Sequence, residues 1–300
     1  MPRAASAACC ASDIAHRPLP NMHNDHPLFK QYPVDSQVLI AGEHCPSPYH
    51  IYAGSMLLIG GTVTGTTARQ LLANERLTPI VNQNDRVLAA LWICDFTEAN
   101  LGPHHELQIS LFASFDPMPP VRSHPFAIYR ALINDRSTRM VCHGLWNNTA
   151  RVVGYNTEHL GLNARLGYSH IARGHGRWQF QVSDDSGLVA TGDLALPARA
   201  APAQMAALMQ HVGIQGLLRS LRAPYVHVPV VNTRSRFADD NWVAHTYTRS
   251  ASQVIWRFTA QDQLLIHYPQ AAAFDFVPDF VQQNDGVRFV YLRPAPESPA

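Results

Sequence analysis

Lysine is almost absent from this sequence. Among 23 Lys and Arg residues in 300, Lys30 is the only lysine. Chemistry that needs an amine nucleophile therefore has one side-chain candidate, near the amino terminus. Charged residues make up 15% of the chain, against about 25% in typical globular proteins. So few charges favour a surface partly buried between subunits, and we expect a homo-oligomer.

An excess of either charge is also missing. The formal net charge is +1, whereas nucleic-acid and anionic-membrane binders need a basic excess. No run approaches the roughly 20 apolar residues of a membrane span. The first 20 residues lack the apolar core of a secretory signal. We therefore expect a cytoplasmic protein with no nucleic-acid and no membrane partner.

Metal and nucleotide motifs are missing too. The five cysteines (Cys9, Cys10, Cys45, Cys94 and Cys142) form no CxxC pair, which excludes a zinc site and a disulfide framework. Cys94 and Cys142 lie in apolar runs and are expected to be buried. The sequence has no glycine-rich nucleotide loop and no HExxH motif. We expect no metal and no cofactor.

The pattern of apolar residues predicts a single α+β domain. We expect a flexible leader over 1–35, the domain over 36–293 and a flexible tail over 294–300. One long helix is expected over 202–221 and a short one from Thr66 or Thr67 to Leu72. Predicted strands cover 50–63, 86–96, 106–112, 126–133, 139–145, 178–182, 188–194, 227–231, 242–249, 253–258 and 287–292. A large antiparallel sheet or barrel fits this order.

Two segments concentrate polar chemistry. His104, His105 and Glu106 open an apolar strand after a tight turn, and adjacent side chains of a strand point to opposite faces. Facing the interior, Glu106 would have a raised pKa suited to a general acid or base; the alternative is a solvated strand end. Residues 154–166 carry Glu158 and Arg165, which an ordinary surface ion pair would also explain.

Together these segments resemble the acetoacetate decarboxylase-like family. Residues 101–106 (LGPHHE) are similar to the family's LGPYxE turn, and 158–166 (EHLGLNARL) to its active-site loop. Residues 54–72 and 276–292 resemble an early strand and helix and the closing segment, so the resemblance covers about 38–292. It implies an α+β fold in which a curved antiparallel sheet closes into a cone-like β-barrel, with a few peripheral helices, around an apolar cavity. It also implies a homo-oligomer.

The decisive residue of that family is missing. Its members decarboxylate β-keto acids through a lysine imine, and that lysine falls here on Ala164, with Arg165 beside it. The family's substrate-binding arginine corresponds to a position near Gly54 and Ser55, and a family acid corresponds to a position within 90–92. This sequence has neither the arginine nor the acid there. Decarboxylation by the family mechanism is therefore excluded.

The remaining residues suggest carbonyl chemistry without an imine. We expect Glu106 and Arg165 to be catalytic and to lie within about 10 Å of each other in one cavity, where charges couple strongly. His104, His105 and Glu158 are expected to bind substrate. The predicted function is binding of a small keto or carbonyl compound, as a non-imine lyase, isomerase or cyclase of specialised metabolism.

Two alternatives stay open. The chain is a non-catalytic ligand-binding protein or a degenerate paralogue of the decarboxylase, as loss of the lysine, the arginine and one acid would suggest. A hydrolase or lyase using His143, His170 or His267 is the other, although no residue spacing supports it.

Overall fold

The computed structural model describes residues 25–73, 77–135, 137–197, 202–222, 225–232, 242–248, 252–267 and 275–292. The helices are α1 (Pro27–Gln31), α2 (Gly65–Leu71), α3 (Ala127–Asn134), α4 (Ala150–Gly154), the π-helix η2 (Tyr155–His159) and α5 (Pro202–Arg222). The strands are β1 (Ser36–Ile40), β2 (Glu43–Ser47), β3 (Tyr49–Thr64), β4 (Thr78–Pro79), β5 (Arg86–Ala99), β6 (His104–Ser114), β7 (Thr138–Asn147), β8 (Ala164–Leu166), β9 (Tyr168–Gly174), β10 (Arg177–Asp184), β11 (Gly187–Ala195), β12 (Tyr225–Asn232), β13 (Trp242–Thr248), β14 (Ser252–Arg257), β15 (Gln263–Ile266), β16 (Val277–Asp285) and β17 (Phe289–Leu292).

The large sheet is organised around a ring of strand pairings. Starting at β3, the pairs run through β5, β6, β7, β12, β13 and β17 and return to β3. All of them are antiparallel except β7 with β12. The fold is therefore α+β and rich in strands, as the apolar pattern predicted.

Strand β5 shows how one sequence run serves two cores. Alternate residues from Leu88 to Phe96 lie in one core, and those from Val87 to Ile93 lie in the other. Because successive side chains of a strand point to opposite faces, a continuous apolar run is what a strand buried on both faces requires. The strand predicted over 86–96 is confirmed, and it is buried on both faces.

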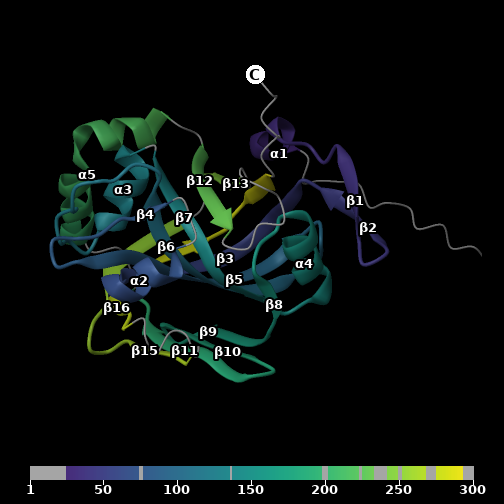
Figure 1. Cartoon of the computed structure of the whole chain (residues 1–300). Helices are drawn as coiled ribbons and strands as arrows, with labels where there is room; N and C mark the ends of the chain where they lie inside the picture. Colours follow the sequence, from purple (N-terminus) through teal and green to yellow (C-terminus); the bar gives the residue numbers. More distant parts are fainter. Residues whose placement is uncertain are drawn as a thin grey trace, which may run out of the picture.

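The second core lies between the large sheet and a small one. Strands β15, β11, β10 and β9 form the four-stranded sheet, which lies below the large sheet in Figure 1. Its Trp178, Phe180 and Val182 are buried against side chains of β5 and β6. Helices α3 and α5 lie on the far side of the large sheet from these strands (Figure 1).

The sequence-based prediction of a strand over 126–133 is wrong. This segment is the helix α3, whose Ala127, Ile128 and Ala131 share one buried face. The apolar residues recur at helical spacing, and β-branched residues are too few to favour a strand. The helix over 202–221 is confirmed as α5, although Gly213 interrupts it with φ +80°.

Part of the leader predicted over 1–35 forms regular structure. Residues 27–31 form α1, with Leu28 and Phe29 buried against Val290 of β17. Phe29 further contacts the rings of His50 and Tyr52, so burial of two large apolar side chains holds this segment in place. Residues 1–24 and the tail 293–300 lie outside the described residues.

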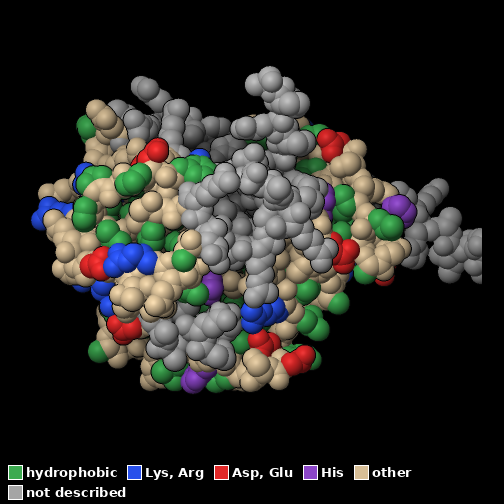
Figure 2. All heavy atoms as spheres, viewed as in Figure 1, with side chains coloured by type: hydrophobic (Ala, Val, Ile, Leu, Met, Phe, Trp, Pro, Cys, Tyr) green, Lys and Arg blue, Asp and Glu red, His purple; other side chains and the backbone are tan. Residues whose placement is uncertain are grey.

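The surface agrees with the near-zero net charge. On the face drawn in Figure 2, basic and acidic side chains are interspersed and no single sign dominates. In the described part of the chain, no helix is both long enough and apolar enough to cross a membrane. Cys94 and Cys142 are free and buried, as predicted.

Candidate active site

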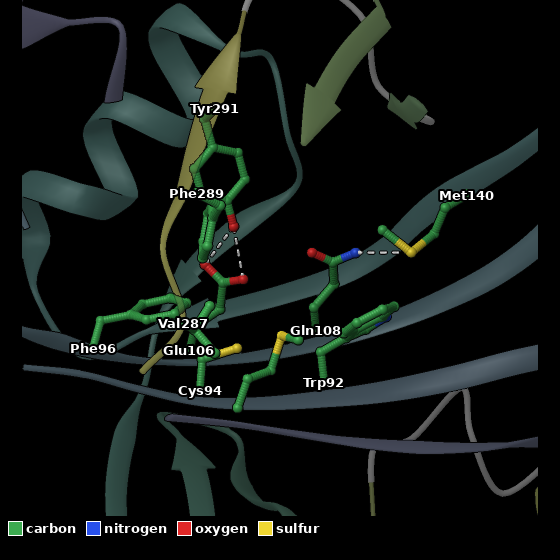
Figure 3. Close-up of a pocket in the computed structure, with 10 residues that line it drawn as sticks. Trp92, Cys94, Phe96, Glu106, Gln108, Met140, Val287, Phe289 and Tyr291 are labelled. Carbon is green, nitrogen blue, oxygen red and sulfur yellow. Dashed lines mark hydrogen bonds between the residues drawn. The ribbon is translucent and has the colours of Figure 1, made fainter. Parts of the chain in front are cut away.

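Glu106 lies in a small cavity inside the ring of strands. Apolar and sulfur-containing side chains dominate the lining, with Phe289 and Tyr291 of β17 on one side and Met140 of β7 on the other (Figure 3). Strand β6 directs Glu106 inward because alternate residues of the strand face this cavity, including Gln108 two positions on. Of the two alternatives left open for Glu106, the structure shows the buried, inward-facing one.

Two neutral donors hold the Glu106 carboxyl group. Tyr291 donates its hydroxyl to Oε1 at 3.0 Å, and the Asn147 amide donates to Oε2 at 3.1 Å. Complete burial raises the pKa of Glu106 to about 7, although both hydrogen bonds act in the opposite direction. At neutral pH the group is therefore divided between acid and carboxylate.

Asn156 fixes the orientation of Asn147. The Asn156 amide donates to Asn147 Oδ1 at 3.0 Å, which leaves the Asn147 nitrogen to face Glu106. Asn156 is fully buried in η2, a π-helical turn of a kind often found at functional sites. Asn156 therefore determines that the amide nitrogen of Asn147, and not its oxygen, faces Glu106.

His104 supports the site through Tyr49. Its Nδ1 lies 3.0 Å from the Gly102 carbonyl oxygen and donates to it, so Nε2 accepts the Tyr49 hydroxyl at 2.5 Å. Burial lowers the pKa of His104 to about 4, which keeps the ring neutral. Tyr49 stacks on Tyr291 with ring centroids 5.1 Å apart. His104 therefore acts on the site through two tyrosines and does not line the cavity itself.

Among the described residues, a hydrogen-bond donor of the cavity wall is left without a partner. Trp92 lines the cavity, and the buried Nε1 of Trp92 has no hydrogen-bond partner. Such a group costs free energy until a ligand or water accepts from it. The cavity volume is about 30 Å³, room for roughly two water molecules, and the flexible thioethers of Met56 and Met140 form part of its wall.

Arg165 does not reach this cavity. In the parallel pairing of β7 with β8, Arg165 lies opposite Trp146, and its guanidinium is 5.7 Å from the centre of that ring. Trp146 is next to Asn147 in β7, so its side chain points to the other face of the sheet from Glu106. The expectation that Glu106 and Arg165 share one cavity is wrong, because strand alternation separates them.

The other expected binding residues are also away from the cavity. His105 points to the outer face, where Nδ1 is 2.8 Å from the Ser169 hydroxyl and Nε2 is 3.6 Å from Asp95. Glu158 is exposed in η2. The prediction that His104 and His105 face opposite sides of the sheet is confirmed, and only Glu106 of the expected residues lines the cavity.

Ala164 takes the inward position in β8. It packs against the same core that surrounds the cavity, whereas its neighbour Arg165 faces outward. The position that the resemblance assigned to the imine-forming lysine thus carries a methyl group. The described residues also contain no group of three or more His, Cys, Asp or Glu that could hold a metal ion.

Sequence reasoning missed three residues that shape the site. Tyr291 and Trp92 were part of predicted strands, and Asn147 lies just beyond the strand predicted over 139–145. Their sequence neighbourhoods carry the strand signal, but the contact of β17 with β6 residues across the ring depends on strand register. No local pattern reports that register.

The comparisons with known proteins agree on the fold. Acetoacetate decarboxylase from Legionella pneumophila superposes with a TM-score of 0.53 and 10% identity, over 83% of this chain and 88% of that chain. The enduracididine biosynthesis enzyme MppR, complexed with pyruvate, gives a TM-score of 0.53 and 14% identity, over 84% and 90%. No family model and no curated protein matches the sequence.

The chain therefore has the acetoacetate decarboxylase-like fold, as the resemblance implied. At 10% and 14% identity this similarity establishes the fold, whereas the function depends on the residues of the site.

Proposed function

We propose that the protein binds a small carbonyl compound in the Glu106 cavity and that Glu106 moves a proton on it, as a lyase, isomerase or cyclase that forms no imine. The observation that carries this proposal is the fully buried Glu106, with its pKa raised to about 7. A carboxyl group titrating near neutrality donates and accepts protons at comparable cost. Among the described residues, Glu106 has only neutral hydrogen-bond donors and apolar walls around it, so it forms no ion pair that would explain its burial as purely structural.

The chemistry balances as an enolisation. The Glu106 carboxylate takes a proton from the carbon next to the carbonyl, and the electron pair of that C–H bond moves onto the carbonyl oxygen. Trp92 donates its unused N–H to that oxygen as negative charge develops there. Protonated Glu106 then returns the proton to the same carbon or to another one, or assists departure of a leaving group.

The lining favours an uncharged ligand. Of the described residues that line the cavity, Glu106 alone is ionisable at neutral pH, and none is an arginine or lysine. A carboxylate ligand would place a second negative charge beside Glu106 with no compensating cation. A ketone or aldehyde without a carboxylate meets no such cost.

The ring of pairings supports a cone-like barrel around this cavity. MppR, whose structure was solved with pyruvate, has the same fold, which fits a carbonyl ligand inside such a container. A homo-oligomer in the cytoplasm and a place in specialised metabolism remain proposals of the same kind.

A non-catalytic binding protein is the second candidate. Two observations favour it. The cavity volume of about 30 Å³ leaves little room for a substrate, and Ala164 carries a methyl group where the resemblance places the family's reactive amine. A ligand larger than a few atoms requires movement of flexible wall residues such as Met56 and Met140.

Deuterium exchange tests the two candidates. Acetone, cyclopentanone and pyruvate are each incubated with the protein in D₂O, and loss of the α-proton signals is followed by NMR. We expect exchange of the neutral ketones, slowed about 100-fold or more in Glu106→Gln. Equal rates for the wild type and this variant would refute proton transfer by Glu106, and saturable ketone binding without exchange would establish the binding protein.

Borohydride reduction tests the absence of an imine. With Ala164 inside and Lys30 exposed and paired with Asp25 at 3.3 Å, no amine faces the cavity among the described residues. We expect no covalent adduct of acetone or acetoacetate on a lysine. A reduced adduct on the peptide that carries Lys30 would overturn the non-imine mechanism.

A further inference from the structure

A second hollow lies between α5, α3 and the segment before α3. Its volume is about 280 Å³, far more than that of the Glu106 cavity. The residues that line it include Arg122, His124, Arg130 and His211, and none of the described lining residues is acidic. Four groups that carry or can accept positive charge therefore surround one open space.

The two histidines form a stacked pair. Their ring centroids are 3.8 Å apart and the ring planes differ by 8°. The backbone N–H of Phe126 donates to His124 Nδ1 at 3.1 Å, so a neutral His124 carries its proton on Nε2. Nε2 of His211 is buried and has no hydrogen-bond partner. The stack thus offers the His211 nitrogen, which has no partner among the described residues.

The two arginines are unpaired as well. In the part of the chain that the structure describes, neither the Arg122 nor the Arg130 guanidinium group makes a hydrogen bond or an ion pair. Burial first, and then the positive groups nearby, lower the pKa of His211 to about 4. Like charges held together without an acid destabilise one another, and an anion between them would remove that cost.

We propose that this hollow binds a small oxyanion with two or more negative charges, built from phosphate or carboxylate groups. Arg122 and Arg130 supply forked guanidinium groups that suit phosphate and carboxylate oxygens. His124 and His211 supply ring nitrogens between them. The site is separate from the Glu106 cavity, shares none of its lining residues and does not depend on the function proposed there.

Calorimetric titration of the full chain with inorganic phosphate and with citrate, at low ionic strength and neutral pH, tests this site. We expect saturable binding of at least one of the two anions, and the comparison shows whether phosphate or carboxylate is preferred. Arg130→Ala and His211→Ala should each weaken that binding about tenfold, the typical worth of a hydrogen bond to a charged group.

Arg151→Ala is the matched control. Arg151 is an exposed arginine of α4, which lies on the opposite side of the molecule from α5 in Figure 1. Its loss should change affinity less than about twofold, because salt screens distant surface charges. Absence of saturable binding of both anions, or equal weakening by Arg151→Ala and Arg130→Ala, would overturn the proposal. Circular dichroism of each variant confirms that a lost affinity is not lost folding.

Discussion

The Glu106 cavity and the hollow at His124 and His211 are opposites in electrostatic design. The cavity holds one acid with hydroxyl and amide donors and no described cation, whereas the hollow holds arginines and histidines with no described acid. Burial moves the two sets of pKa values in opposite directions, up for Glu106 and down for His211, and each shift favours the uncharged form. Burial therefore lets Glu106 keep its proton up to about neutral pH, whereas burial and the neighbouring positive groups together keep His211 neutral.

The pH dependence of stability is the largest expected difference between the two regions. Glu106 has a pKa of about 7 in the folded protein against 4.5 in the reference state, so the folded chain holds its proton more tightly. Stability from this group is complete below pH 4.5 and is lost as pH rises to about 7, a change of about 3 kcal/mol.

Urea unfolding of the wild type and Glu106→Gln from about pH 5 to about pH 8 checks this prediction, since that range spans most of the shift. The variant should show a flatter profile and exceed the wild type in free energy of unfolding at the alkaline end. Parallel profiles would mean that Glu106 titrates normally.

Loss of the Tyr291 hydroxyl should have the next largest effect. Tyr291→Phe removes a donor to the buried carboxyl group, which should cost about 1–2 kcal/mol and raise the pKa of Glu106 further. The cost should grow above pH 7, where the carboxylate predominates. Tyr168→Phe, at a tyrosine that is 59% exposed, is the control and should change the free energy of unfolding little. Equal costs for the two variants would contradict the assigned role.

A smaller effect is expected at the cation-lined hollow. Arg130→Gln should raise the free energy of unfolding at low salt by up to about 0.5 kcal/mol, because it relieves repulsion among like charges. Added salt or phosphate should erase the difference by screening or by binding. Destabilisation at low salt would show that Arg130 has a stabilising partner in solution.

No coupling is expected between Glu106 and Arg165. Their side chains point to opposite faces of the sheet, so the effects of Glu106→Gln and Arg165→Ala should add within about 0.5 kcal/mol in a double-mutant cycle. A coupling energy above about 1 kcal/mol would place Arg165 in contact with the cavity in solution.

The sequence predicted the parts of this molecule that depend on local pattern. Strands β5, β10 and β11 follow from the pattern of apolar residues, and the fold followed from a resemblance carried mainly by two motifs. The sequence left two positions open for Glu106, and the structure shows the inward one. The prediction that Glu106 and Arg165 lie in one cavity was wrong, because a shift of one residue in strand register moves a side chain to the opposite face of the sheet. Tyr291 and Trp92 were missed because their contacts join strands far apart in sequence.

The ionisation of Glu106 is the most direct test of the central claim. Infrared difference spectra of wild type minus Glu106→Gln isolate its carboxyl stretch as pH rises from about 4 to about 9, a range that covers ordinary and shifted carboxyl groups. The structure predicts a band that disappears with a midpoint near pH 7, shared between acid and carboxylate at neutral pH. A midpoint near 4.5, the ordinary value for glutamate, would contradict the claim that this cavity holds a proton-transfer group.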